Sequence, residues 1–344
     1  MTKLKVGIAG FGVVGKRRKA CIDIHPDLEV IAVCDKNLIK EETNQGVLYF
    51  STYSELLLID LDILFVCLTN DMAAEVTIKG LQKGLHIFCE KPPGRNLREI
   101  KDVIKIEKNL KYQKLMYGFN HRYHDSVKEA IRIVESQQFG KIINMRGLYG
   151  KGKLITFNQP TWRTKRQIAG GGVLLDQGIH MLDLFRLFAG EFNEVQSFVS
   201  NDHWGYDVED NAYAIMRSKT GVVAMLNSSA TQWRHRFNLD INLEKGSLIL
   251  GGLLTGTKSY GAETLKIVTS DPDNDKGDPK EQTTLYNKDN SWMEEINLFA
   301  SYIKNNELVS KGSSEDALET MRLVNKIYYN DIQWREKFQI PNPD

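Results

Sequence analysis

The chain has 344 residues, of which 42% are hydrophobic and 26% charged, and its formal net charge is +1. This length suits two domains better than one, and the composition is that of a globular protein. A net charge near zero gives no overall field for attracting nucleic acid, and no run of about 18 apolar residues is present to span a membrane. The sequence therefore predicts a two-domain protein with neither nucleic acid nor a membrane as a partner.

Four cysteines are present, and none belongs to a C-x-x-C pair: Cys21, Cys34, Cys67 and Cys89. Their spacing fits no pattern of zinc ligands, so we expect free thiols in a reducing cytoplasm and no metal site. The apolar N-terminus loosely imitates a secretory signal, but it runs into the basic residues 16–19 without a small-residue cleavage site. We interpret that basic run as a solvated helix face.

From Leu4 to about Phe119, short apolar runs alternate with helical patterns. The runs that predict strands are Lys5–Ala9, Leu28–Cys34, Ile63–Leu68, Leu85–Cys89 and Leu115–Phe119. Strands that alternate with helices are typical of a parallel sheet with helices on both of its faces. We therefore predict an N-terminal α/β domain over residues 1–119.

The first predicted strand leads directly into a G-x-G-x-x-G motif at the start of a helix. Its residues are Gly10, Phe11, Gly12, Val13, Val14 and Gly15. The first glycine permits a tight turn, the second lets the backbone approach a pyrophosphate, and the third allows close packing of helix on strand. The N–H groups at the start of the helix favour phosphate binding. The motif thus predicts a Rossmann dinucleotide-binding domain, and a glycine-rich turn without a ligand is the alternative.

Asp35 ends the second predicted strand, about twenty residues after the glycine motif. A carboxylate at this place would bind the adenosine ribose hydroxyls and repel a 2′-phosphate. It favours NAD(H), while the adjacent Lys36 leaves NADP(H) open. The alternative is that Asp35 caps the next helix.

The fourth predicted strand ends at Glu90-Lys91-Pro92-Pro93. Ligands of open parallel sheets bind at the carboxyl ends of the strands, so Lys91 is predicted to point toward the nicotinamide. There it could bind a substrate hydroxyl and stabilise a developing alkoxide. The prolines indicate a fixed turn, with a cis bond as one option. A surface lysine beside a turn is the alternative.

A predicted helix follows three glycines at residues 170–172 and carries Asp176, His180 and Asp183 at positions i, i+4 and i+7. This spacing puts the three on one helix face. Histidine suits proton transfer near neutral pH, and a carboxylate can orient the imidazole. We therefore predict an acid–base pair of Asp176 and His180, with a structural His–Asp contact as the alternative. A metal is disfavoured because no third ligand is evident.

Together these segments resemble the Gfo/Idh/MocA family, named for glucose–fructose oxidoreductase and inositol dehydrogenase. The resemblance also rests on residues 118–123 (Gly-Phe-Asn-His-Arg-Tyr) and on Trp162-Arg163. It implies a C-terminal α+β domain over residues 120–344 with a large, mostly antiparallel open β-sheet, through which homodimers or homotetramers form. Runs that read as its strands are Ile142–Tyr149, Glu194–Val199, Ala212–Arg217, Val222–Asn227, Phe237–Leu243 and Leu265–Val268.

The resemblance further implies the roles of individual residues. The implied catalytic group is Lys91, Asp176 and His180. Cofactor contacts are implied for the glycine motif, Asp35, Thr69, Asn70, Glu90, Lys91 and Asn120. Substrate contacts are implied for Lys91, Asn120, Arg122, Trp162, Arg163, Asp176 and His180. The loop after Asn70 departs from the family, many members of which carry a proline and later a histidine there.

The implied activity is hydride transfer between nicotinamide and the secondary hydroxyl or keto carbon of a sugar, sugar acid, cyclitol or nucleotide-linked sugar. Two basic segments, residues 164–166 and 234–236, either hold a diphosphate or carboxylate or are solvated loop charges. One alternative is an NAD-dependent glycoside hydrolase or lyase with an internally recycled cofactor. The other is a non-catalytic dinucleotide-binding sensor, which would need no proton relay.

Overall fold

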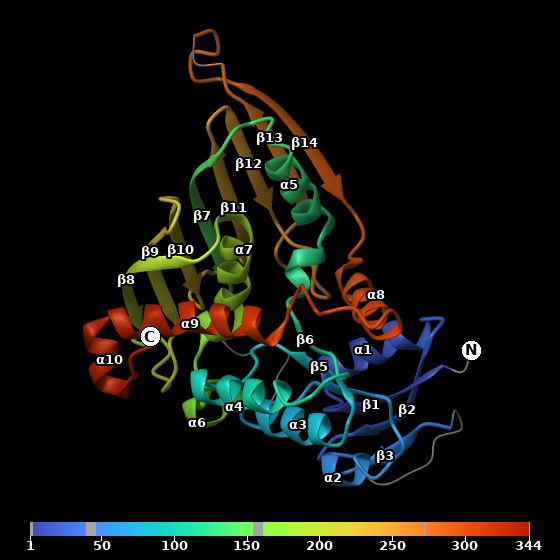
Figure 1. Ribbon diagram of the computed structural model, residues 1–344. Helices are drawn as coiled ribbons and strands as arrows, with labels where there is room; N and C mark the ends of the chain where they lie inside the picture. Colours follow the sequence, from blue (N-terminus) through green and yellow to red (C-terminus); the bar gives the residue numbers. More distant parts are fainter. Residues whose placement is uncertain (1–2, 39–45, 154–160, 272, 344) are drawn as a thin grey trace. The chain divides into compact units, whose positions relative to one another are not determined.

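A computed structural model describes residues 3–38, 46–153, 161–271 and 273–343 of the chain. The chain divides into two compact units (Figure 1). The first comprises residues 1–120, 167–170 and 292–318, and the second comprises residues 121–166, 171–291 and 319–344. Each unit therefore includes segments that are far apart in the sequence.

The first unit contains a six-stranded parallel sheet in the order β3-β2-β1-β4-β5-β6. Its strands are β1 (Leu4–Ala9), β2 (Leu28–Cys34), β3 (Leu48–Phe50), β4 (Ile63–Val66), β5 (His86–Glu90) and β6 (Leu115–Gly118). This order is that of a dinucleotide-binding Rossmann fold, which confirms the predicted fold class. Sequence analysis missed β3, because three residues are too few to show a periodicity.

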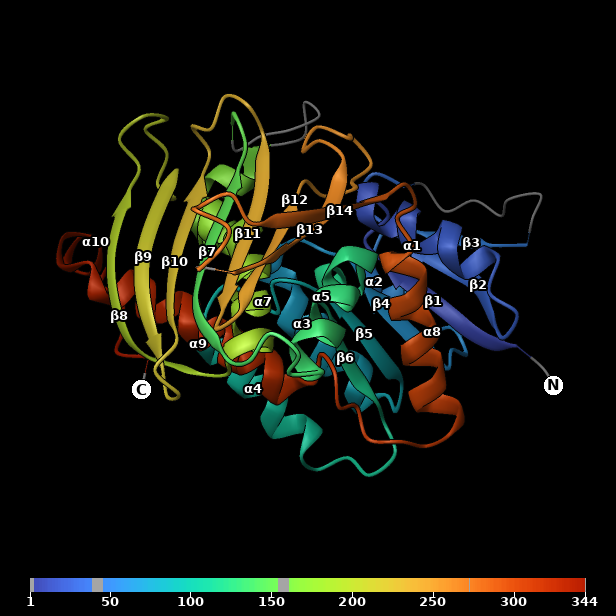
Figure 2. The same ribbon diagram turned by 90° about the horizontal axis from the view of Figure 1, so that it is seen from above.

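Helices cover both faces of this sheet. They are α1 (Val13–Asp23), α2 (Tyr53–Leu56), α3 (Asn70–Gln82), α4 (Leu97–Glu107), the short α6 (Arg166–Ala169) at the border of the unit, and α8 (Ser291–Lys304). Helix α8 lies beside α1 on one face, while α3 and α4 lie together on the other (Figures 1 and 2). Phe299 of α8 packs on Phe65 and Phe88, with ring centroids 6.1 and 5.5 Å apart. A helix close to the C-terminus thus completes the core of the N-terminal sheet.

The second unit contains an eight-stranded sheet in the order β14-β13-β12-β11-β7-β10-β9-β8. Its strands are β7 (Ile142–Gly150), β8 (Phe192–Ser200), β9 (Asn211–Ser218), β10 (Val223–Ser229), β11 (Arg236–Leu243), β12 (Gly246–Gly251), β13 (Glu263–Thr269) and β14 (Lys280–Tyr286). Only β7 and β10 pair in parallel, so the prediction of a mostly antiparallel sheet is confirmed. Strand β12 and the edge strand β14 were not predicted; β14 begins with five polar residues and is exposed except at Tyr286, so it shows no buried face.

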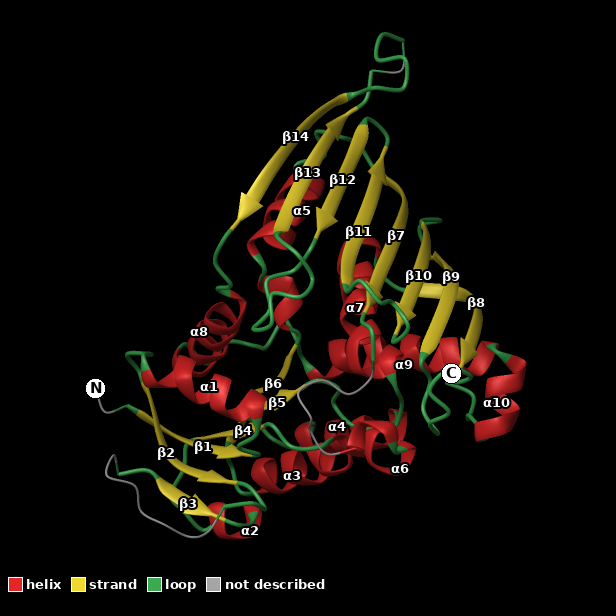
Figure 3. Cartoon of the chain, turned by 180° about the vertical axis from the view of Figure 1, so that it is seen from behind, coloured by secondary structure: helices red, strands yellow, loops and turns green. Residues whose placement is uncertain are grey.

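One face of this sheet is covered by α5 (Asp125–Glu135) and α7 (Ile179–Ala189), and the opposite face is turned toward the viewer in Figure 3. Strand β9 shows the consequence, because Ala212, Ala214 and Met216 are buried while Tyr213 and Ile215 between them are exposed. Helices α9 (Ser314–Asn330) and α10 (Ile332–Phe338) close the chain. None of the described helices is long and apolar enough to cross a membrane.

Candidate active site

The glycine motif forms the turn between β1 and α1. Gly10 has a φ of +92°, and a Cβ atom there would lie 2.3 Å from the carbonyl oxygen of Cys67. A Cβ on Gly15 would lie 2.0 Å from the carbonyl oxygen of Gly10. Gly12, the residue before the helix, has nothing within 4 Å of its Cβ position. The fold itself thus requires Gly10 and Gly15, whereas Gly12 borders open space at a helix N-terminus, as a bound pyrophosphate needs.

Asp35 follows β2 and is tied to this turn. Its Oδ2 accepts a hydrogen bond from the N–H of Phe11 at 3.0 Å, and its Oδ1 accepts one from the N–H of Asn37 at 3.1 Å. The carboxylate is therefore held beside the glycine motif. The residues that directly follow it form a turn, closed by a hydrogen bond from the N–H of Leu38 to the carbonyl oxygen of Asp35 at 2.9 Å, and residues 39–45 lie outside the described residues.

Thr69 and Asn70 begin helix α3 and both engage neighbours in the first unit. The Thr69 hydroxyl donates to Asp71 at 2.6 Å, and the Asn70 amide donates to the carbonyl oxygen of Ala169 at 2.7 Å. Asn70 thereby anchors residues 167–170 to the Rossmann unit. Their cofactor contacts stay predictions.

Glu90 ends β5 and is bound by Arg18 of α1. The Arg18 Nε donates to Glu90 at 2.6 Å, and its Nη2 donates to Glu295 of α8 at 2.5 Å. The guanidinium carbon lies 4.4 Å from the ring centroid of Phe88 and 4.3 Å from that of Trp292. Burial alone would lower the pKa of Arg18, but the two carboxylates raise it above its ordinary value. The interpretation of residues 16–19 as a solvated helix face was therefore wrong for Arg18, which is fully buried.

Lys91 directly follows this anchored glutamate and is partly exposed. The peptide bond between Lys91 and Pro92 is cis, which was one of the options for the proline turn. Lys91 thus stands at the carboxyl end of a central strand of the parallel sheet, where the open α/β topology places ligands.

Asp176 belongs to the second unit, in a π-helical turn (Leu174–Gly178) that leads into α7. Such turns are rare and occur frequently at functional sites. Its Oδ2 lies 3.0 Å from the Nζ of Lys151, and its Oδ1 lies 3.8 Å from the Nε of Arg163. Two cations thus lie beside this carboxylate. Sequence analysis missed Lys151, a single lysine after a strand with no motif around it.

His180, in the first turn of α7, is 5% exposed. Its ring stacks on that of His121, with centroids 3.7 Å apart and planes 14° from parallel. The Nε2 of His121 is hydrogen-bonded to the Tyr149 hydroxyl at 3.2 Å. Burial raises the pKa of Tyr149, so its hydroxyl stays protonated at neutral pH. His121 was missed as a neighbour of the candidate base, because 59 residues separate the two in sequence.

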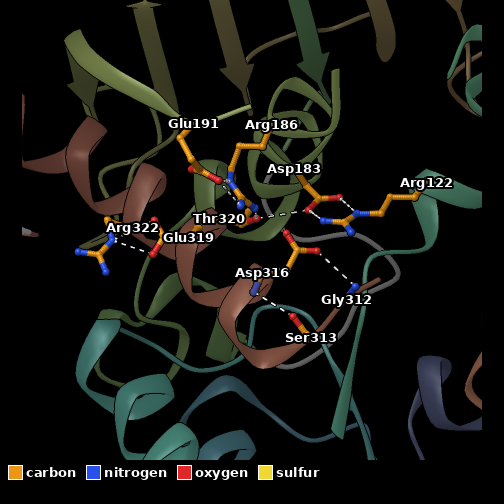
Figure 4. A network of polar contacts seen from close by, with 10 residues as sticks. All are labelled: Arg122, Asp183, Arg186, Glu191, Gly312, Ser313, Asp316, Glu319, Thr320 and Arg322. Atoms are coloured by element: carbon orange, nitrogen blue, oxygen red, sulfur yellow. Dashed lines mark hydrogen bonds and ion pairs between the residues drawn. The ribbon is translucent and has the colours of Figure 1, made fainter. Parts of the chain in front are cut away.

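The third polar residue of the predicted helix face, Asp183, is fully buried (Figure 4). It forms a bidentate pair with Arg122, whose Nε donates at 2.6 Å, and it accepts a hydrogen bond from Thr320 at 3.3 Å. Arg186 donates to the same Thr320 hydroxyl at 2.6 Å. This network joins α7 to α9 and gives Arg122 a structural contact, while its contact with substrate stays a prediction.

The remaining predicted substrate residues lie at different places. Trp162 stacks under Arg163, whose guanidinium carbon is 4.4 Å from the ring centroid and whose Nε faces Asp176. Asn120 is buried in a 3-10 turn, Asn120–Tyr123, at the end of the first unit. The second unit therefore gathers Trp162, Arg163 and Asp176 into one cluster.

The two basic segments prove heterogeneous. Arg166 is partly buried and stacks over Phe338, with 4.4 Å between guanidinium carbon and ring centroid, so it is not a fully solvated loop charge. His235 has a lowered pKa because of burial and, secondly, because of the charge of Lys151, and its Nδ1 is hydrogen-bonded to the Ser259 hydroxyl at 3.0 Å. Both observations weaken the expectation that these segments bind a diphosphate or carboxylate.

Residues 4–119 match the profile of an oxidoreductase family with an NAD-binding Rossmann fold, and residues 127–249 match the GFO/IDH/MocA C-terminal domain. Levoglucosan dehydrogenase of Pseudarthrobacter phenanthrenivorans is 30% identical over 217 residues, covering 58% of this chain and 55% of that enzyme. The match thus spans little more than half of that relative. Myo-inositol 2-dehydrogenase of Thermotoga maritima is 24% identical over 88% of this chain and 89% of that enzyme. D-glucoside 3-dehydrogenase of Escherichia coli is 27% identical over 66% and 70%.

The fold is shared with solved structures over nearly the whole chain. Levoglucosan dehydrogenase in complex with NADH superimposes with a TM-score of 0.84 and 21% identity, covering 97% of this chain and 98% of that one. The NADH complex of WlbA dehydrogenase from Bordetella pertussis, which also holds UDP-GlcNAcA, gives a TM-score of 0.77 at 20% identity, covering 96% of each chain. These TM-scores establish a common fold.

Proposed function

The chain belongs to the Gfo/Idh/MocA family of oxidoreductases, and on this premise we propose that it transfers hydride between a nicotinamide cofactor and a secondary hydroxyl carbon of a sugar or cyclitol. The relatives named above are dehydrogenases of levoglucosan, D-glucosides and myo-inositol, all of them polyhydroxylated rings. The single observation that carries the proposal is that one chain combines open space at Gly12, before a helix N-terminus, with a helical segment that carries a buried histidine and an aspartate paired with a lysine.

The glycine turn fits a dinucleotide. The open space at Gly12 and the N-terminus of α1 suit its pyrophosphate, and the fixed carboxylate of Asp35 suits the adenosine ribose. Because Asp35 would repel a 2′-phosphate, we propose that NAD(H) is preferred over NADP(H). When bound, the cofactor accepts the hydride from the substrate carbon.

The residues of this chain supply the remaining chemistry. The neutral imidazole of His180 takes the hydroxyl proton, held in one orientation by its stacking on His121. Lys91 donates a hydrogen bond to the same oxygen and stabilises its developing negative charge. Asp176, which pairs with Lys151, accepts a hydrogen bond from a further substrate hydroxyl.

The uncovered sheet face supports an oligomer. Phe198, Tyr213, Ile215 and Met225 are between 47% and 79% exposed. They lie opposite one another across β8, β9 and β10, so they form one apolar surface. Apolar surfaces of this kind mark interaction sites. We propose that it joins copies of the chain into a homodimer or homotetramer, which light scattering would show and Phe198→Lys would weaken.

A titration with NADH and NADPH, followed by fluorescence, tests the cofactor site. We expect NADH to bind, and Gly12→Ala to weaken that binding strongly, because the added methyl group would occupy the space of the phosphates. The same variant should unfold at the wild-type temperature, since its Cβ meets no atom within 4 Å. A chain that binds neither dinucleotide would overturn the proposal.

A further inference from the structure

Lys151 follows β7 at a place that the backbone fixes on both sides. Its N–H donates to the carbonyl oxygen of Ser229 at 2.8 Å, and its own carbonyl oxygen accepts from the N–H of Gln232 at 3.0 Å. The residue is therefore held against the end of β10. Its side chain is 5% exposed, which is exceptional for a lysine.

The buried ammonium group has a single hydrogen-bond partner among the residues that the structure describes. That partner is the Oδ2 of Asp176, at 3.0 Å. An ammonium group carries three N–H donors, so this one keeps two for another acceptor. The Asp176 side chain is 28% exposed, and the two oxygens of a carboxylate accept about four hydrogen bonds between them, so the bond from Lys151 does not exhaust them. Burying a charge with incomplete hydrogen bonding is costly, so such a pair indicates a ligand site.

The charges of the pair decide which ligand it suits. With Arg163 3.8 Å from Asp176, the cluster holds two cations and one carboxylate, but a phosphate or carboxylate that bound Lys151 would lie against Asp176 and be repelled by it. A neutral hydroxyl, in contrast, both donates and accepts hydrogen bonds. Because the Lys151 Nζ and the Asp176 Oδ2 are 3.0 Å apart, the two side chains can bind neighbouring hydroxyls of the same ring.

We propose that Lys151 and Asp176 form a clamp for two adjacent hydroxyl groups of the substrate. Asp176 accepts a hydrogen bond from one hydroxyl, and Lys151 donates one to the oxygen of the next. This inference rests on the proposed function and narrows its substrate class to neutral rings with vicinal hydroxyls near the oxidised carbon. Lys151 is then a residue that determines specificity, and it takes no part in hydride or proton transfer.

The test compares a substrate with its monodeoxy analogues. Wild-type protein is assayed for NADH formation with myo-inositol, levoglucosan and methyl β-D-glucopyranoside, and then with the monodeoxy analogues of whichever is oxidised. Hydrogen bonds to charged groups predict a loss of kcat/KM of about 10- to 100-fold when one clamped hydroxyl is absent. Lys151→Met should show a similar loss on the parent substrate but no further loss on that analogue.

Two further variants control the experiment. Lys141→Met places the same substitution at the other end of β7, on an exposed residue, and should discriminate as wild type does. Lys151→Arg keeps the donors and should restore part of the discrimination. Should Lys151→Met fail to fold, as judged by NADH binding and thermal unfolding, the isosteric Asp176→Asn makes the same test from the other side of the clamp.

The outcomes separate the clamp from the proposed function. A Lys151→Met enzyme that still discriminates against the analogue as strongly as wild type would overturn the clamp alone. A wild-type protein that binds NAD(H) but oxidises none of the three polyols would overturn the proposed function, and the clamp with it.

Discussion

Each unit of this protein buries a basic side chain, and the two are treated in opposite ways. In the first unit, Arg18 is fully buried between two aromatic rings and is bound by Glu90 and Glu295, which are 13% and 0% exposed. In the second, Lys151 is almost as deeply buried, yet its one partner among the described residues, Asp176, is 28% exposed. Arg18 has its charge balanced twice, whereas Lys151 retains unused donors.

The difference shows how a structural ion pair can be told from a functional one. A cation surrounded by carboxylates and rings has no capacity left for a ligand, so Arg18 fixes α1, β5 and α8 against one another. A buried cation whose ion-pair partner is partly exposed keeps N–H donors available for a ligand, at a position that excludes most water. Burial alone therefore does not identify a site, but burial with incomplete pairing does.

The largest expected effect is on folding. Arg18→Met would leave Glu90 and Glu295 buried without a counter-charge, so we expect a loss of about 3–5 kcal/mol in the free energy of unfolding. Lys19→Met, one residue along the same helix, removes only a surface pair with Asp23 and should cost less than about 1 kcal/mol. Urea denaturation measures both. Equal losses would contradict a structural role for Arg18.

The second effect is on turnover. We expect His180→Ala to lower kcat by about 100-fold or more, the usual contribution of a general acid–base group, and Lys91→Ala to do the same. His203→Ala serves as the control, because His203 is exposed on the second unit. The comparison uses steady-state kinetics with a polyol that the wild-type protein oxidises. Near-normal turnover of the His180→Ala variant would show that His180 is not the base of the proposed mechanism.

A smaller effect concerns cofactor choice. Asp35→Asn keeps an oxygen for the N–H of Phe11 but removes the negative charge beside the ribose. We expect the ratio of NADH to NADPH affinity to fall by about 10-fold, the scale of a hydrogen bond to a charged group. Fluorescence titration gives the ratio, and an unchanged ratio would show that Asp35 only shapes the turn.

The smallest expected effect is on the pKa of His235, which reports whether the positive charge of Lys151 acts on its neighbours. The pKa of His235 is lowered first by burial and secondly by Lys151. Lys151→Met should therefore raise that pKa part of the way toward its ordinary value. Because a lowered histidine pKa costs stability as the pH falls below about 6.5, the variant should also lose less stability on acidification. NMR titration of the imidazole measures this pKa. An unchanged value would show that the charge of Lys151 does not act on His235.

The sequence predicted most of what local pattern controls. The glycine turn, the Glu-Lys-Pro segment and most strands of the two sheets have periodicities or motifs that fix them within a few residues, whereas β3, β12 and β14 were not predicted. The helix face of Asp176, His180 and Asp183 was predicted as one polar stripe, but the π-helical turn and the packing give each residue a different partner: Lys151, His121 and Arg122.

What escaped prediction depends on distant partners. Arg18 meets Glu295 across 277 positions, and nothing in its basic run shows which residue faces the core. Lys151 has no motif, and its importance arises only when β7 places it against the turn that carries Asp176. Pairings of this kind are properties of the folded chain, so sequence pattern gives no signal for them.

The most direct test of the central claim is absorbance at 340 nm when NAD⁺ is mixed with the protein and a panel of cyclitols, sugars and glycosides. The account predicts NADH formation with at least one neutral polyol, and its loss in His180→Ala. Cleavage of a glycoside without net NADH would contradict it and point to a hydrolase or lyase with a recycled cofactor. Dinucleotide binding with no reaction on any compound would point to a sensor.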